Sequence, residues 1–142
     1  MNRRADRGVV APRVDVQFGR PQRQHEPGEQ LAVRYRIDGC DGERIRAIEH
    51  SVLWYTEGKG EEDMGVHFFQ RITDQSLLPP AATSGAFSTP LPWSPLSYEG
   101  VVVKIRWCVR VRLFFDGSRD FVSEHVFTVG RIPPARVPSS GS

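Results

Sequence analysis

The stretch from residue 101 to residue 115 constrains the fold more than any other part of the chain. Its odd positions are all apolar: Val101, Val103, Ile105, Trp107, Val109, Val111, Leu113 and Phe115. Its even positions include Lys104, Arg106, Cys108, Arg110 and Arg112. A period of two is typical of a β-strand with one buried and one solvated face, and a helix does not produce it. Because such a strand spans about 50 Å at ~3.4 Å per residue, we expect a bulge or a bend within it.

Other segments have the composition of shorter strands. Residues 14–18 and 31–37 alternate apolar and polar side chains, and residues 48–55, 66–72 and 121–129 are rich in β-branched and aromatic residues. Turn signals separate them at Pro27-Gly28, at residues 39–42, at residues 58–60 and at Asp116-Gly117-Ser118. Prolines at positions 79, 80, 90, 92 and 95 disfavour a helix before the long strand. The sequence therefore predicts an all-β fold, a two-sheet antiparallel β-sandwich of about seven strands.

Charge is distributed unevenly along the 142 residues, which we predict to form one domain over residues 13–130. The chain carries +2 overall; residues 1–13 carry +3 (four arginines and one aspartate) and residues 131–142 carry +2 (two arginines), which leaves −3 for residues 14–130. A nucleic-acid-binding domain would carry its positive charge on the folded body, so we expect no specific nucleic-acid partner. The polar ends, residues 1–12 and 131–142, are predicted to be disordered basic tails.

The sequence also predicts where the protein works. It contains no run of about 18 apolar residues, so we expect no membrane span. No hydrophobic segment follows the N-terminal arginines, which argues against a secretory signal. We therefore expect a protein of the bacterial or archaeal cytoplasm, in which Cys40 and Cys108 remain thiols.

Several short motifs around the long strand occur in an order that is found in a known family. Residues 87–100 contain Leu91-Pro92, Ser97-Tyr98 and Gly100, and lead into the long strand with Trp107 near its middle. Upstream, Pro27-Gly28-Glu29 precedes the strand at residues 31–37, and residues 121–129 follow as a closing strand. Over about residues 14–130 this pattern resembles the arrestin-like β-sandwich. The resemblance implies a binding scaffold whose edges and loops contact other proteins, and it implies no catalytic site.

The chain departs from that family in one respect. Arrestins and their retromer-subunit relatives carry two such sandwiches, whereas 142 residues leave room for one. The interdomain cleft and the polar core of the two-lobed proteins therefore have no counterpart here. An immunoglobulin-like or a C2-like sandwich would explain the same pattern of strands.

Basic side chains are expected to form the interaction face of this scaffold. Lys104, Arg106, Arg110 and Arg112 would lie on one face of the long strand, with alternate neighbours ~7 Å apart. If Arg34 and Arg36 lie on a neighbouring strand, all six form one cationic patch for an acidic peptide, phospholipid headgroups or nucleic-acid phosphates. The alternative is that acids on adjacent strands, such as Glu49 and Glu124, neutralise the row.

The leading functional hypothesis is thus a non-enzymatic protein-interaction module that binds a protein partner. We expect no cofactor, no metal and no catalytic residues. A homodimer through its sheet edges is possible. The chain has no Walker, EF-hand, HExxH or GxSxG motif. One alternative is a metal-dependent hydrolase or calcium-binding domain, built from Glu61, Glu62, Asp63 and His67, with Asp116 and Asp120 if two loops meet. Another alternative is a carbohydrate-binding module that uses Trp93, the tryptophan expected to be exposed.

Overall fold

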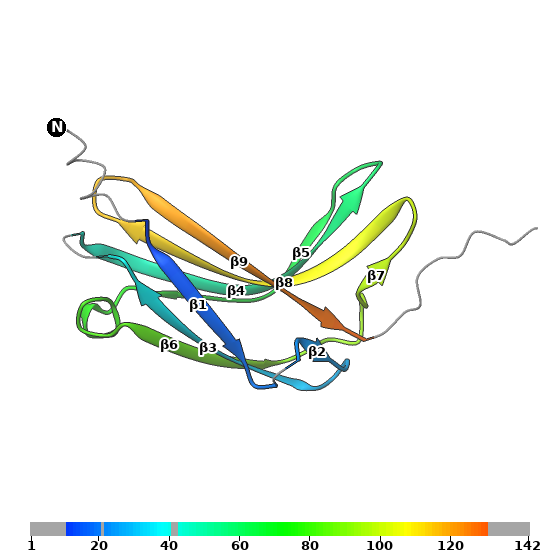
Figure 1. Ribbon diagram of the computed structural model, residues 1–142, viewed down its shortest axis with the longest axis horizontal. Coiled ribbons are helices and arrows are strands. Elements are labelled where there is room, and N and C mark those ends of the chain that lie inside the picture. The colour runs from blue at the N-terminus through cyan, green and yellow to red at the C-terminus, as the bar shows by residue number, and fades with distance from the viewer. Residues whose placement is uncertain (1–10, 21, 41–42, 131–142) are drawn as a thin grey trace, which may run out of the picture.

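A computed structural model describes residues 11–20, 22–40 and 43–130, and within them the chain forms nine strands and one short 3-10 helix (Figure 1). The strands are β1 (Arg13–Phe18), β2 (Gln24–His25), β3 (Gln30–Asp38), β4 (Ile45–Gly58), β5 (Met64–Ile72), β6 (Ser84–Pro90), β7 (Tyr98–Glu99), β8 (Val103–Phe115) and β9 (Asp120–Val129). The helix η1 covers Gln75–Leu77. In this part of the chain no helix is long and apolar enough to cross a membrane. The predicted disordered tails, residues 1–12 and 131–142, lie outside the described residues except for residues 11 and 12.

The strands form two sheets that pack face to face, so the predicted β-sandwich is confirmed. One sheet has three strands in the order β1-β3-β6. The other has six, in the order β2-β9-β8-β4-β5, with β7 paired to the first residues of β8. Every pairing is antiparallel except the short one between β2 and β9. Seven strands have six or more residues, which is the number predicted, and β2 and β7 have two residues each.

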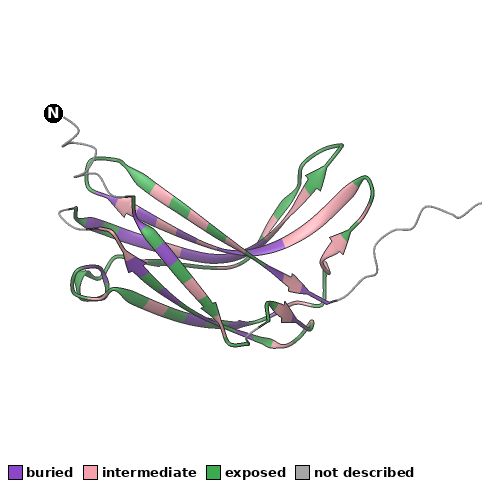
Figure 2. Ribbon diagram, viewed as in Figure 1, coloured by how far each residue is buried: buried purple, intermediate pink, exposed green. Residues whose placement is uncertain are grey.

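The long strand β8 lies at the centre of the six-stranded sheet and follows the alternation on which its prediction rested. Five odd positions are buried on the face toward the three-stranded sheet (Figure 2): Trp107, Val109, Val111, Leu113 and Phe115. The strand begins two residues later than expected, because Val101 and Val102 are exposed. The register irregularity between β8 and β4 falls between Ile45 and Ala47, so the extra residue belongs to β4, while β8 accommodates its length by bending (Figure 1).

Strand β6 is an element that the sequence pattern did not predict. Its sequence, SGAFSTP, is mostly small and polar, and only Phe87 and Thr89 in it are buried. It is defined by pairing with β3, from Gln30 opposite Pro90 to Arg36 opposite Ser84. Local composition therefore carried no strand signal here, and the neighbouring strand supplies the hydrogen bonds that define this one.

The core lies between the inner faces of the two sheets. From β3 it receives Leu31, Val33, Tyr35 and Ile37, which the alternation over residues 31–37 had placed on one face. Trp107 is fully buried, as expected, and its indole N–H donates to the carbonyl oxygen of Pro95 at 2.8 Å. This hydrogen bond fixes the loop before β7 against the centre of β8.

A buried polar contact links the two sheets inside this core. Tyr35 of β3 and His50 of β4 lie 2.9 Å apart between the hydroxyl and Nδ1, and His50 Nε2 lies 2.7 Å from Gln70 Oε1 of β5. Since the amide oxygen only accepts, Nε2 carries the proton and the Tyr35 hydroxyl donates to Nδ1. The imidazole also stacks on Phe87 of β6, with ring centroids 4.3 Å apart. Burial lowers the pKa of His50 and raises the pKa of Tyr35 to about 12, so both groups are neutral at physiological pH.

The central position of β8 predicts the effect of shortening its buried side chains. Leu113→Ala removes a fully buried leucine, so we expect the free energy of unfolding to fall by about 2–5 kcal/mol. The same substitution at the exposed Leu77 is the control and should change it by less than about 0.5 kcal/mol. Urea denaturation followed by tryptophan fluorescence measures both, and equal effects would contradict the observed burial of β8.

The buried histidine predicts how stability depends on pH. The unfolded state binds a proton at His50 more readily than the folded state, because burial lowers the folded pKa below the usual value of 6.5. The stability linked to His50 is therefore fully present above its pKa in the unfolded state and is lost as the pH falls through its lower pKa in the folded state. We expect His50→Gln, which removes the titrating group, to lose less stability over this range than the wild type. Urea denaturation at a series of pH values measures this, and equal slopes for the two proteins would contradict the prediction.

Candidate interaction site

The predicted row of basic residues on β8 lies on the outer face of the six-stranded sheet. This is the face turned away from the three-stranded sheet. Every residue of the row forms an ion pair. The N···O distances are 2.7 Å for Arg110–Glu124, 2.6 Å for Arg112–Asp120, 2.6 and 3.1 Å for Arg106 with Glu57 and Glu99, and 3.7 Å for Lys104–Glu99. Glu124 thus neutralises the row as the alternative hypothesis expected. Glu49 does not, because it pairs with Arg71 of β5 at 2.6 Å. Four basic side chains face four acids, so the row has no excess positive charge.

Arg34 and Arg36 do not extend this row. Both project from the outer face of β3, which belongs to the three-stranded sheet, and Arg36 lies 3.6 Å from Asp38. The six residues predicted to form one cationic patch are therefore divided between opposite outer surfaces of the sandwich. The expectation failed because β3 and β4, although consecutive in the sequence, belong to different sheets. A binding role for any of the six stays a prediction.

An apolar row crosses the same outer face between these ion pairs. Val66 of β5 pairs with Leu53 of β4, Leu53 pairs with Cys108 of β8, and Cys108 pairs with Val126 of β9. Directly opposed residues share a face, so these four side chains form one continuous line across four strands. Leu53 and Cys108 are buried in the middle, while Val66 and Val126 are 55% and 40% exposed at its ends.

The outer face exposes more apolar surface than this row alone. Of the nine large hydrophobic residues that are exposed in the described part of the chain, five lie on this face: Met64, Val66, Phe69, Val122 and Val126. These exposed side chains lie at the two ends of the row, on β5 and β9, while Leu53 and Cys108 between them are buried. Grouped exposed apolar side chains on a solvated sheet face are typical of interaction sites. The sequence analysis had placed only charged side chains here.

A groove of about 750 Å³ opens beside the apolar row, where the β4–β5 hairpin turns away from the three-stranded sheet (Figure 1). Its side chains come from β4, the hairpin, β8 and β9: Tyr55, Thr56, Glu57, Glu62, Asp63, Met64, Arg110 and Glu124. Four of these are acids and one is basic. Glu62 and Asp63 form no ion pair with a described residue, although the Asp63 carboxylate accepts a hydrogen bond from the Met64 amide at 2.9 Å. The groove therefore combines apolar surface with excess negative charge.

Two titratable groups on this face are partly shielded from water. Burial raises the pKa of the Tyr55 hydroxyl, and the neighbouring carboxylates of Glu57 and Glu124 raise it further. Burial raises the pKa of the Cys108 thiol to about 12. A thiol with such a pKa is protonated and unreactive at neutral pH, so Cys108 is a buried apolar residue of the row.

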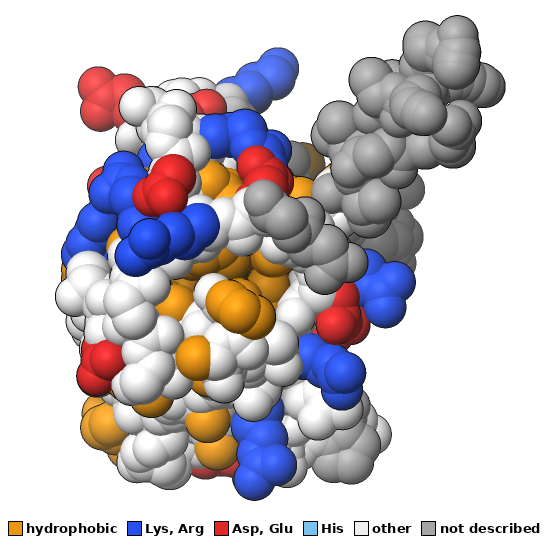
Figure 3. Space-filling view, turned by 90° about the vertical axis from the view of Figure 1, so that its left-hand side faces the viewer, with side chains coloured by type: hydrophobic (Ala, Val, Ile, Leu, Met, Phe, Trp, Pro, Cys, Tyr) orange, Lys and Arg blue, Asp and Glu red, His pale blue; other side chains and the backbone are white. Residues whose placement is uncertain are grey.

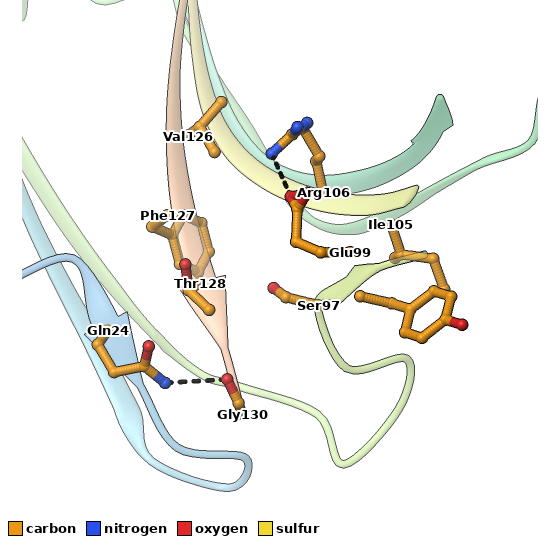
Figure 4. A pocket seen from close by; sticks show the side chains of 10 residues that line it. Gln24, Ser97, Glu99, Ile105, Arg106, Val126, Phe127, Thr128 and Gly130 are labelled. Atoms are coloured by element: carbon orange, nitrogen blue, oxygen red, sulfur yellow. Dashed lines mark hydrogen bonds and ion pairs between the residues drawn. The ribbon is translucent and has the colours of Figure 1, made fainter. Parts of the chain in front are cut away.

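A smaller cavity of about 170 Å³ lies between β7, β8 and β9 (Figure 4). Its polar groups are engaged with one another: Arg106 with Glu99 at 3.1 Å, the Gln24 amide with the Gly130 carbonyl at 2.9 Å, and Ser97 Oγ with the Val129 amide at 2.9 Å. Ligand pockets have volumes of ~300–1,000 Å³, so this cavity admits a few waters or one small side chain.

An apolar hollow is visible at the end of the sandwich opposite the β4–β5 hairpin (Figure 3). Its volume is about 580 Å³, and its lining includes Ile37, Pro79 and Pro80, with Glu43 and Arg44 at its charged rim. Residues 41 and 42, which precede Glu43, lie outside the described residues.

The residues proposed for a metal site are held apart. Asp116 and Asp120 lie at the β8–β9 turn, whereas Glu61, Glu62 and Asp63 lie in the β4–β5 hairpin beside the opposite end of β8 (Figure 1). His67 Nε2 donates to the carbonyl oxygen of Pro90 at 2.7 Å, which ties β5 to the end of β6. The two loops thus do not meet, and within the described residues no three His, Cys, Asp or Glu side chains form a group that could hold a metal ion.

Two further side-chain arrangements concern the remaining hypotheses. Trp93 is 75% exposed, as expected, and carbohydrate binding through it stays a prediction.

Ser123 Oγ lies 2.6 Å from His125 Nε2 on β9. Sequence motifs for nucleophilic serines do not reveal this contact, because they require a fixed spacing of residues that is absent here. Burial lowers the pKa of His125. Both residues lie within the regular strand β9 and outside any turn.

Comparison with known proteins identifies the fold. No protein-family model matches the chain, and no curated protein matches it. Among solved structures, it is similar to Spo0M, a sporulation control protein from Bacillus subtilis, with a TM-score of 0.65 and 19% sequence identity over 88% of this chain and 51% of that chain. The chain therefore spans about half the length of Spo0M. The resemblance that the motifs of residues 87–100 indicated is confirmed at the level of fold: the chain forms an arrestin-like β-sandwich.

Proposed function

We propose that the chain is a non-enzymatic protein-interaction module, which binds a polypeptide segment on the outer face of its six-stranded sheet. The observation that carries the proposal is the apolar row formed by Val66, Leu53, Cys108 and Val126, whose ends Val66 and Val126 are exposed on this face. Spo0M is a sporulation control protein, so the same fold serves a control function there.

The charge of the groove supports a particular class of partner. Glu62 and Asp63 form no ion pair with a described residue, and Arg110 is already paired with Glu124. An acidic segment would place like charges together in the groove, whereas a basic one would pair with these carboxylates. The proposed partner is thus a segment with both apolar and basic side chains, which reverses the charge that the basic row had suggested.

Selection from a random-peptide display library on the immobilised protein tests this proposal. We expect enrichment of peptides that combine Lys or Arg with apolar residues, because the former pair with the groove acids and the latter cover the apolar row. Enrichment of acidic peptides, or turnover in a broad hydrolase screen, would contradict the proposal.

Two valines on β9 provide a matched pair of variants for the same experiment. Val126 and Val122 are both exposed on the outer face, but Val126 belongs to the apolar row and Val122 lies opposite Arg112, four residues away. We expect Val126→Lys to weaken binding of the selected peptides at least about tenfold, equivalent to ~1.4 kcal/mol, and Val122→Lys to leave it unchanged. Equal effects of the two substitutions would place the binding surface elsewhere.

A further inference from the structure

Strand β5 forms one edge of the six-stranded sheet. It has nine residues, and among the described strands it pairs only with β4 along its whole length. At the other side of the sheet, the two-residue strand β2 covers Thr128 and Val129 of β9. An edge strand presents a row of backbone N–H and C=O groups that another strand can pair with. Native edges are commonly protected by prolines, by many charges or by β-bulges, and of these β5 contains a single arginine and one bulge, at His67.

The backbone groups on the free side of β5 can be assigned to particular residues. The Asp63 carbonyl accepts a hydrogen bond from the Thr56 amide of β4 at 3.0 Å. Since successive residues alternate in direction, the N–H and C=O groups of Met64 and Val66 point away from β4. The Met64 amide accordingly donates to the Asp63 carboxylate rather than to β4.

A β-bulge then shifts this alternation in the middle of the strand. Val52 of β4 lies opposite Phe68, but the next residue, Leu53, lies opposite Val66, so His67 is an extra residue in β5. Beyond the bulge, Phe69 and Arg71 share the outer face with Met64 and Val66. The inner face confirms this assignment, because Phe68 packs against the core and Gln70 reaches the buried His50.

Because of this bulge, two copies of β5 can pair antiparallel with their outer faces matched in one alignment. In an antiparallel pair, residues directly opposite each other project from the same face. When two copies of β5 are placed antiparallel about a two-fold axis, one alignment keeps every outer residue opposite an outer residue: Val66 faces Phe69 of the second copy, and Met64 faces Arg71 of the second copy. Moving the alignment by one or two residues places outer side chains opposite inner ones.

We propose that two copies of the chain associate edge to edge through β5 in this alignment, so that their six-stranded sheets form one continuous sheet. Two apolar contacts between Val66 and Phe69 then lie on either side of the two-fold axis. Arg71 of each copy lies diagonally across from Glu62 of the other, where opposite charges attract. The proposal goes beyond the groove that binds a partner segment, because it uses the free backbone of β5, whereas the groove is complete within one copy.

The surface area buried between the two copies indicates how strongly they should associate. Stable protein interfaces bury about 1,200–2,000 Å² in total, and the pairing of one nine-residue strand buries less. The dimer is therefore weak and reversible, and it forms as the protein concentration rises. Sedimentation velocity over a range of concentrations up to about 1 mM, where weak complexes form, measures it directly.

Variants at the two opposed positions test the alignment. V66E/F69E places like charges opposite each other across the axis, and V66E/F69K places opposite charges there with the same loss of apolar surface. We expect the dimer dissociation constant of V66E/F69E to exceed that of V66E/F69K at least about tenfold. As a control, V122E, on the outer face of β9 and away from the edge, should dimerise as the wild type does.

A backbone variant tests the hydrogen bonds separately from the side chains. Val66→Pro removes an N–H that points away from β4, so it leaves the pairing with β4 intact and removes a donor to the second copy. We expect it to weaken the dimer at least about tenfold, with the thermal unfolding midpoint as the check that the fold is retained. A wild type that stays monomeric over the whole range, or equal association of V66E/F69E and V66E/F69K, would overturn the proposal. Peptide selection uses the immobilised wild-type chain and none of the Val66 variants, so a failure of the dimer proposal and a failure of the peptide proposal come from separate measurements.

Discussion

The pairing of β4 with β8 is the contact on which the rest of the structure depends. Its ladder runs from Ile45 opposite Phe115 to Gly58 opposite Val103, and it joins the two longest strands at the centre of the larger sheet. Because side chains alternate with a period of two, a slip of one residue would move every core side chain of β8 to the solvent. The burial of Trp107, Val111 and Leu113 therefore holds the register. The ion pairs on the other face, such as Arg110–Glu124, follow from that register.

Much of this architecture could be predicted from the sequence, since the alternation is a local property of the chain. Residues 31–37 and 103–115 form the expected strands, with the expected faces buried over residues 31–37 and 107–115, and the Asp116-Gly117 turn connects two paired strands. Strand β6 could not be found in this way, because its small residues have no pattern of their own. The assignment of each strand to one of the two sheets could not be predicted from local patterns either. Nothing in the segments at residues 31–37 and 48–55 indicates that they lie in opposite layers, and this is why Arg34 and Arg36 were grouped with β8.

The candidate site shows where local patterns stop being informative. Its apolar row takes one residue from each of four strands, so it exists only once the register between them is set. One signal was present in the sequence: Cys108 interrupts the charged side of β8 between Arg106 and Arg110. An uncharged residue at that position indicates that the polar face is not polar throughout. Its partners, Leu53 and Val126, could be identified only from the pairings of β8 with β4 and β9.

The bulge in β5 connects the core to the surface on which both proposals rest. If β5 were a regular strand, with no bulge at His67, the alternation would place Phe69 and Arg71 toward the core, and Phe68 and Gln70 toward solvent. The imidazole of His50 would then lose its acceptor Gln70. The bulge avoids this, because it lets Phe68 and Gln70 point inward while Met64, Val66 and Phe69 all point outward. The same bulge that completes the core therefore produces an apolar outer face, and it gives the free edge a symmetry that a regular strand with this sequence would lack.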